Sequence, residues 1–117
     1  MEKTIQHSVL IKIPEGRLEE FKQIATEVLK LVREKDTETL KYDWFLNSDQ
    51  TECEIHEEYK SSEAIMKHVT NLGGTLQKLL TDFPSERFAV YGDPSPQLQE
   101  MLKGVGAKFY TFFQGLD

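Results

Sequence analysis

The sequence of 117 residues predicts an α+β fold in which helices pack on an antiparallel sheet. Three observations lead to this prediction. Segments in which apolar and polar residues alternate, as in strands, are interspersed with segments whose apolar residues lie three and four apart, as in helices. The connections between these segments are short and polar. The length is that of one common domain, so we expect a single hydrophobic core.

The first two elements are a strand and a helix. Residues 7–13, HSVLIKI, are rich in β-branched and aliphatic side chains and end at Pro14, which is typical of a strand. From Gly16 to about Lys35 the sequence predicts an amphipathic helix with one buried stripe. The stripe consists of Leu18, Phe21, Ile24, Ala25, Val28, Leu29 and Val32.

The next two elements predict a β-hairpin. Residues 40–47 place Leu40, Tyr42, Trp44 and Leu46 on one face, with Phe45 as an apolar exception on the other. Residues 52–59 alternate again, although Glu57 interrupts the apolar set on its face. The intervening residues 47–51 are small and polar, so their side chains can hydrogen-bond the backbone of a short turn.

A second helix, a fourth strand and a C-terminal extension complete the chain. Ser61 or Ser62 can cap the helix, which Gly73-Gly74 should bend or interrupt before Pro84 ends this section. Residues 86–92 predict the fourth strand. We assign residues 1–92 to the core of the domain and residues 93–117 to an extension of it. The extension contains a short helix that starts at residues 93–96 and a fifth, aromatic strand over residues 107–115.

The resulting order, β-α-β-β-α-β with a further helix and strand, describes the ferredoxin-like arrangement. Its antiparallel sheet carries helices on one face only. Apolar residues such as Leu10, Phe45 and Phe112 suggest that the other face is too apolar for water. We therefore expect a homodimer in which two sheets pack face to face, with the aromatic strand from Phe109 to Phe113 either pairing with the partner or closing one end of a pocket.

Composition excludes several classes of function. The net charge is −6, and the basic residues are scattered, which argues against nucleic acid as a partner. No apolar run is long enough to cross a membrane, and the N-terminus lacks the apolar core of a signal peptide, so we expect a cytoplasmic protein. The single cysteine, Cys53, is interpreted as a buried apolar filler. Glu54, His56 and Glu58 share a strand face, but exposed carboxylate rows are ordinary and we predict no metal site.

The stretch YDWFLNSDQTECEIHEEYKSSEAIMKHV, residues 42–69, resembles the antibiotic-biosynthesis monooxygenase (ABM) domain of the dimeric α/β-barrel superfamily. The resemblance rests on an aromatic second strand, on Glu58-Tyr59, and on Ser62, Ala64 and His68. It extends over about residues 5–92. It implies a homodimer with one pocket per subunit and oxidation of a small aromatic or quinol-like substrate by molecular oxygen, with neither metal nor flavin. Heme-degrading relatives carry an Asn in the first strand where this chain has His7 or Ser8, which argues against a heme oxygenase.

Such chemistry requires a polar group that deprotonates or orients a phenol inside an apolar chamber. The candidates are His68, Tyr42, Trp44, His7 and Glu58. His68 borders the buried stripe of its helix and is either a base or a structural link to a strand. Glu58 either orients His68 or favours the start of the helix.

The aromatic candidates and His7 also have two interpretations. Tyr42 and Trp44 share a strand face and either line a pocket or belong to the core. His7 points inward if its strand alternates regularly, and a ligand or a backbone carbonyl can satisfy it. Two functions therefore remain: a cofactor-independent monooxygenase, or a non-catalytic dimeric module that is stress-associated or only binds a small molecule. If His68, Tyr42 and His7 share one cavity, the enzyme is favoured.

Overall fold

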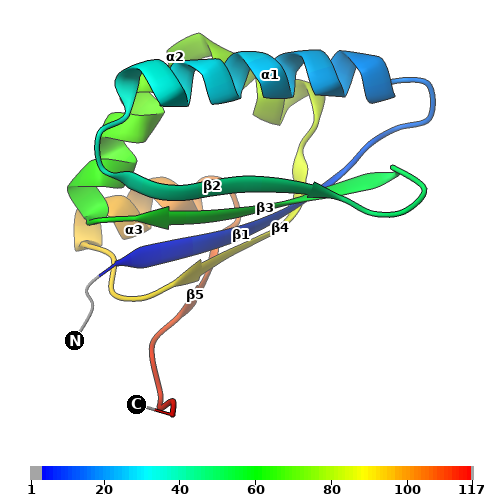
Figure 1. Ribbon diagram of the computed structural model, residues 1–117. Coiled ribbons are helices and arrows are strands. Elements are labelled where there is room, and N and C mark those ends of the chain that lie inside the picture. Colours follow the sequence, from blue (N-terminus) through cyan, green and yellow to red (C-terminus); the bar gives the residue numbers. More distant parts are fainter. Residues whose placement is uncertain (1–3, 117) are drawn as a thin grey trace.

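The computed structural model describes residues 4–116 and confirms the predicted α+β, ferredoxin-like fold (Figure 1). Five strands and three helices follow one another in the predicted order. They are β1 (Ile5–Lys12), α1 (Leu18–Lys35), β2 (Thr39–Leu46), β3 (Glu52–Tyr59), α2 (Ser62–Asp82), β4 (Ser85–Tyr91), α3 (Pro96–Lys103) and β5 (Lys108–Tyr110).

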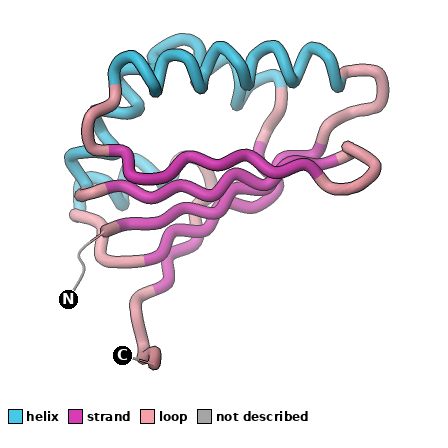
Figure 2. Tube along the Cα trace, in the orientation of Figure 1, coloured by secondary structure: helices cyan, strands magenta, loops and turns pink. Residues whose placement is uncertain are grey.

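The strands form one sheet in the order β2-β3-β1-β4-β5. The first four pair in antiparallel fashion, and β5 adds to the edge of β4 in parallel. Val9 in the central strand lies opposite Ile55 of β3 and Phe88 of β4, so these side chains share one face. Figures 1 and 2 show that α1 and α2 both cover this face, which we call the inner face.

The strands differ from the prediction most clearly in β5 and β2. The fifth strand covers only Lys108–Tyr110, and residues 111–116 leave the sheet as an extended tail. In β2 the register shifts between Thr39 and Lys41, which breaks the alternation. Leu40 is consequently 54% exposed, although it was expected on the same face as Tyr42.

The helix ends follow from local sequence. The Ser61 hydroxyl caps α2 by accepting a hydrogen bond from the Ala64 amide at 3.2 Å, and Ser95 caps α3 in the same way. Helix α2 is bent at Gly73, where φ is 49° and ψ is −127°. An L-residue rarely adopts this conformation, so the predicted bend is confirmed and glycine explains it.

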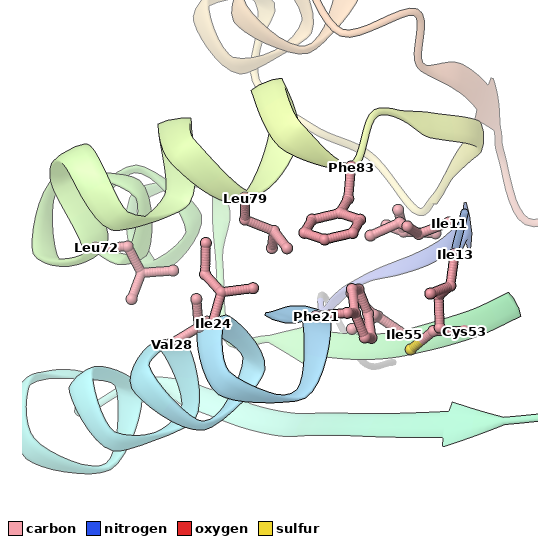
Figure 3. Close-up of a cluster of buried hydrophobic side chains, with 11 residues drawn as sticks. Ile11, Ile13, Phe21, Ile24, Val28, Cys53, Ile55, Leu72, Leu79 and Phe83 are labelled. Carbon is pink, nitrogen blue, oxygen red and sulfur yellow. The ribbon is translucent and has the colours of Figure 1, made fainter. Parts of the chain in front are cut away.

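The main core lies between α1, α2 and the inner face of the sheet (Figure 3). Phe21 of α1 meets Phe83 edge to face, with ring centroids 5.2 Å apart, and the Arg17 guanidinium lies 4.5 Å above the Phe83 ring. Cys53 is buried in the same cluster. A second cluster joins Leu98 and Leu102 of α3 to Ile5 and Val90 of the sheet.

The outer face of the sheet is more mixed than predicted. Phe45 and Tyr110 are about half exposed there, but Glu54 lies between them in the sheet and pairs with Arg87 at 3.4 Å. In the tail, Phe112 and Phe113 are 72% and 88% exposed. Within residues 4–116, none of the helices combines the length and apolar character that crossing a membrane requires.

Candidate functional site

A cavity of about 540 Å³ lies between the inner face of the sheet and the helices. Strands β1 to β4 form its floor, both halves of α2 cover it, and a further wall comes from Met101, Leu102 and Val105 at the end of α3. Most of the lining is apolar. The side chains with polar groups are His7, Tyr42, Glu57, Tyr59, His68 and Gln77.

His68 is a basic group of the cavity whose imidazole is held in place by a buried carboxylate. Its side chain is 5% exposed, and its Nδ1 lies 2.7 Å from Oδ2 of Asp36, which is 3% exposed. Asp36 follows the last residue of α1, so the contact joins the end of one helix to the first half of the other. Thr39 and Asn71 also donate to this carboxylate, at 2.6 Å and 2.8 Å.

These contacts fix the proton on the imidazole. Burial acts to raise the pKa of Asp36, but hydrogen bonds from Thr39, Asn71 and His68 act against it, and the pKa ends below its ordinary value. An ionised carboxylate only accepts hydrogen bonds, so Nδ1 of His68 carries the proton that points to Asp36. In the neutral ring, Nε2 is then left with a lone pair.

Two tyrosine rings enclose His68. The ring of Tyr42 lies edge-on at a centroid distance of 5.0 Å, and that of Tyr59 at 5.1 Å. Burial, followed by the nearby charge of Glu57, raises the pKa of both phenols well above the usual value. Both tyrosines are therefore neutral near pH 7 and serve as hydrogen-bonding or packing groups.

Glu57 forms a second buried polar cluster with His7 and Tyr59. The Tyr59 hydroxyl donates to Oε1 of Glu57 at 2.5 Å, and Nδ1 of His7 lies 3.2 Å from the same oxygen. Burial acts to raise the pKa of Glu57, but the hydrogen bond and charge of His7, with the Tyr59 hydroxyl, bring it below its ordinary value. Nε2 of His7 is buried and has no hydrogen-bond partner among residues 4–116.

The structure brings three of the five predicted residues together: His68, Tyr42 and His7 line the same cavity. Trp44 does not line it. Its ring instead packs 5.9 Å from Phe21 and 5.8 Å from Tyr42, as part of the core.

Glu58 also lies away from the cavity. Neighbouring residues of a strand point to opposite faces, so Glu58 points away from the inner face on which Glu57 lies. It lines a smaller pocket of about 270 Å³ together with Lys41 and Tyr91. The idea that Glu58 orients His68 is therefore wrong, because Asp36 is the carboxylate that contacts the imidazole.

Sequence reasoning missed Asp36 and the role of Glu57. Glu57 did leave a signal, since a charged residue at an inward position of an alternating strand needs a partner. Asp36 left none, because it is 32 residues from His68 and meets it only through the packing of the helices. Among the described residues, no group of three His, Cys, Asp or Glu side chains is arranged to hold a metal ion.

The comparisons with known proteins agree with this architecture. A family model described as antibiotic biosynthesis monooxygenase matches residues 5–72, which is more than half of the chain. No curated protein matches the sequence closely enough to count as a relative.

Solved structures show the same fold. MupZ from Pseudomonas fluorescens is 20% identical, with a TM-score of 0.78 over 99% of this chain and 95% of that chain. A candidate antibiotic biosynthesis monooxygenase from Nitrosomonas europaea is 16% identical, with a TM-score of 0.64 over 82% of this chain and 95% of that one. A conserved protein from Methanosarcina mazei is 12% identical, with a TM-score of 0.66 over 77% and 92%. Because the family model covers more than half of its length, this chain belongs to the antibiotic biosynthesis monooxygenase family.

Proposed function

We propose that the protein is a cofactor-independent monooxygenase that oxidises a small aromatic or quinol-like substrate in the cavity under α2. The observation that carries this proposal is the Asp36–His68 pair, which presents a basic nitrogen in an otherwise largely apolar chamber. Family membership supports monooxygenase chemistry in general. The substrate class and the independence from a cofactor are our inference from the cavity.

His68 would begin the reaction as a general base. A phenol or activated C–H of the substrate loses its proton to Nε2, and Asp36 stabilises the imidazolium that results. The electron-rich anion then reduces molecular oxygen. For a hydroquinone, one oxygen atom enters the product as a hydroxyl on the quinone and the other leaves as water, so the substrate itself supplies all the electrons.

The apolar walls have a function in this scheme. They exclude water from the substrate anion and strengthen its interaction with the imidazolium, because charges interact more strongly at low dielectric. Tyr42 and Tyr59 stay neutral, so neither competes with His68 as a base. The cavity volume of about 540 Å³ is in the range of sites for small organic ligands.

Oxygen consumption tests the proposal directly. The purified protein is incubated with a panel of hydroquinones and anthrones in an oxygen electrode, beside His68→Ala and Trp44→Phe variants. We expect uptake with at least one substrate and, because a general base contributes about 10²-fold or more, a loss of that order in His68→Ala. Trp44→Phe is the matched control, since Trp44 packs in the core outside the cavity and should retain activity.

Two results would contradict the proposal: no uptake with any member of the panel, or equal uptake by wild type and His68→Ala. In the first case, saturable binding of the same compounds would instead favour the non-catalytic binding module.

Members of this family are commonly dimers, and we propose that this chain forms a homodimer through the outer face of its sheet. The exposed Phe45, whose ring lies tilted against that of His56 at a centroid distance of 5.1 Å on that face, supports this location. Phe45→Glu should shift the mass measured by light scattering from dimer toward monomer. As a control, Lys30→Glu at an exposed position of α1 should leave the dimer intact. If Phe45→Glu formed a dimer of unchanged stability, the outer face would be excluded as the dimer interface.

A further inference from the structure

The cavity contains a second imidazole, that of His7, which has no role in the proposed reaction. The rings of His7 and His68 both lie against the ring of Tyr59, at centroid distances of 5.4 Å and 5.1 Å. Each imidazole contacts a carboxylate through Nδ1, His7 through Glu57 and His68 through Asp36. The same chemical unit therefore occurs twice in one cavity.

The proton positions follow from these carboxylates. Glu57 is ionised and already accepts a hydrogen bond from Tyr59, so its contact with His7 requires a proton on Nδ1 of His7. Nε2 of the neutral ring then carries a lone pair. Like His68, His7 thus offers a hydrogen-bond acceptor and holds its donor on the side of the carboxylate.

Nε2 of His7 lacks any partner within the described chain. The residue is only 4% exposed, yet this nitrogen makes no hydrogen bond. Buried polar atoms are almost always paired, so an unpaired one beside a cavity indicates a missing donor. Among the described residues, Nε1 of Trp44 is the other buried side-chain nitrogen without a partner, but the Trp44 ring lies outside the cavity.

We propose that Nε2 of His7 is a second binding point of the cavity, and that the ligand is a dihydroxylated aromatic molecule with one hydroxyl on His68 and the other on His7. The largely apolar lining of the cavity suits a flat hydrocarbon body. The inference rests on the site of the proposed function and deepens it, but it concerns binding and requires no turnover.

Binding under nitrogen tests this inference without the reaction. The probes are 1,5-, 2,6- and 2,7-dihydroxynaphthalene, their mono-methyl ethers, and 1- and 2-naphthol, each titrated calorimetrically. A hydrogen bond to a buried acceptor contributes about tenfold in affinity, so we expect one diol to bind about tenfold more tightly than either naphthol. Its mono-methyl ether, which lacks one donor, should bind like a naphthol.

The variant His7→Asn isolates the second binding point. The Asn amide can still donate to Glu57 in place of Nδ1, but it has no atom in place of Nε2. The preference for the diol over naphthol should fall from about tenfold to about one, while naphthol itself binds as it does to wild type. His68→Asn, the matched variant of the other pair, should weaken diol and naphthol alike.

The inference is overturned if no diol exceeds the naphthols, if the methyl ether binds as tightly as the diol, or if His7→Asn keeps the preference. The methyl-ether comparison uses the wild-type protein, so it decides the matter even if the variant does not fold. A diol preference, together with no oxygen uptake from any member of the hydroquinone and anthrone panel, would contradict the proposed reaction and leave the binding point standing.

Discussion

Replacing Gly73 with alanine should destabilise the protein through its backbone alone. At φ 49° and ψ −127°, Gly73 has a conformation that costs an L-residue about 1–3 kcal/mol. A methyl group at this position would meet no atom within 4 Å, so no steric clash contributes. Alanine also lowers the conformational entropy of the unfolded chain, which stabilises the folded state by about 0.4–1 kcal/mol. We therefore expect a net loss of about 1–2 kcal/mol in the free energy of unfolding.

Gly74→Ala provides the matched control. Gly74 lies next to Gly73 and also lines the cavity, and a methyl group there also meets nothing within 4 Å. Its backbone is helical, however, so alanine should stabilise the helix by up to about 1 kcal/mol. Urea unfolding of the two variants should thus shift the midpoint in opposite directions at an unchanged slope. If Gly73→Ala were as stable as wild type, the bend would not depend on glycine.

Three further predictions follow from the core and the carboxylates. Phe83→Ala should lower the free energy of unfolding, measured in urea, by about 3–5 kcal/mol, because it removes a buried ring between Phe21 and Arg17. A loss below about 1 kcal/mol would contradict this packing. The lowered pKa of Asp36 means that its ionisation stabilises the fold above pH ~4 and that this contribution disappears as the pH falls through its folded-state pKa. The advantage of wild type over Asp36→Asn in urea should therefore shrink between pH 7 and pH 3, and a constant difference would refute the assignment. Burial raises the pKa of Cys53 to about 11. A disulfide reagent at pH 8 should therefore label this thiol slowly in the native state and rapidly in urea. Equal labelling rates would show that the thiol is accessible in the native state.

The order of elements could be predicted from the sequence because local patterns determine it. Apolar residues in α1 repeat with the period of a helix, and the limits of β3 agree with its alternation. The fifth strand was predicted too long because aromatic residues favour strands wherever they occur. In the structure, β5 ends after Tyr110, and Phe112 and Phe113 have no neighbouring strand within the described chain.

The site was harder to predict because it depends on contacts between distant segments. A helix period places His68 near the buried side, but nothing local indicates that Asp36 will meet it. Glu57 interrupts the apolar pattern of its strand, and only the pairing of β1 with β3 shows that His7 lies directly opposite Glu57. The alternation of β2 correctly predicts that Trp44 shares a face with Tyr42. The contact of its ring with Phe21 depends on how α1 packs on the sheet, which the local sequence does not show.

The order of the strands also affects how the protein avoids aggregation. Strand β2 is one edge of the sheet, and β5 pairs with β4 only from Ala89 to Tyr91, so part of β4 is an edge as well. Such edges expose backbone groups that can recruit a strand from another molecule. Lys41 and Asp43 on β2 and Glu86 and Arg87 on β4 are exposed at these edges. A strand added at either edge would have to strip water from these charges, which discourages the stacking of chains into fibres.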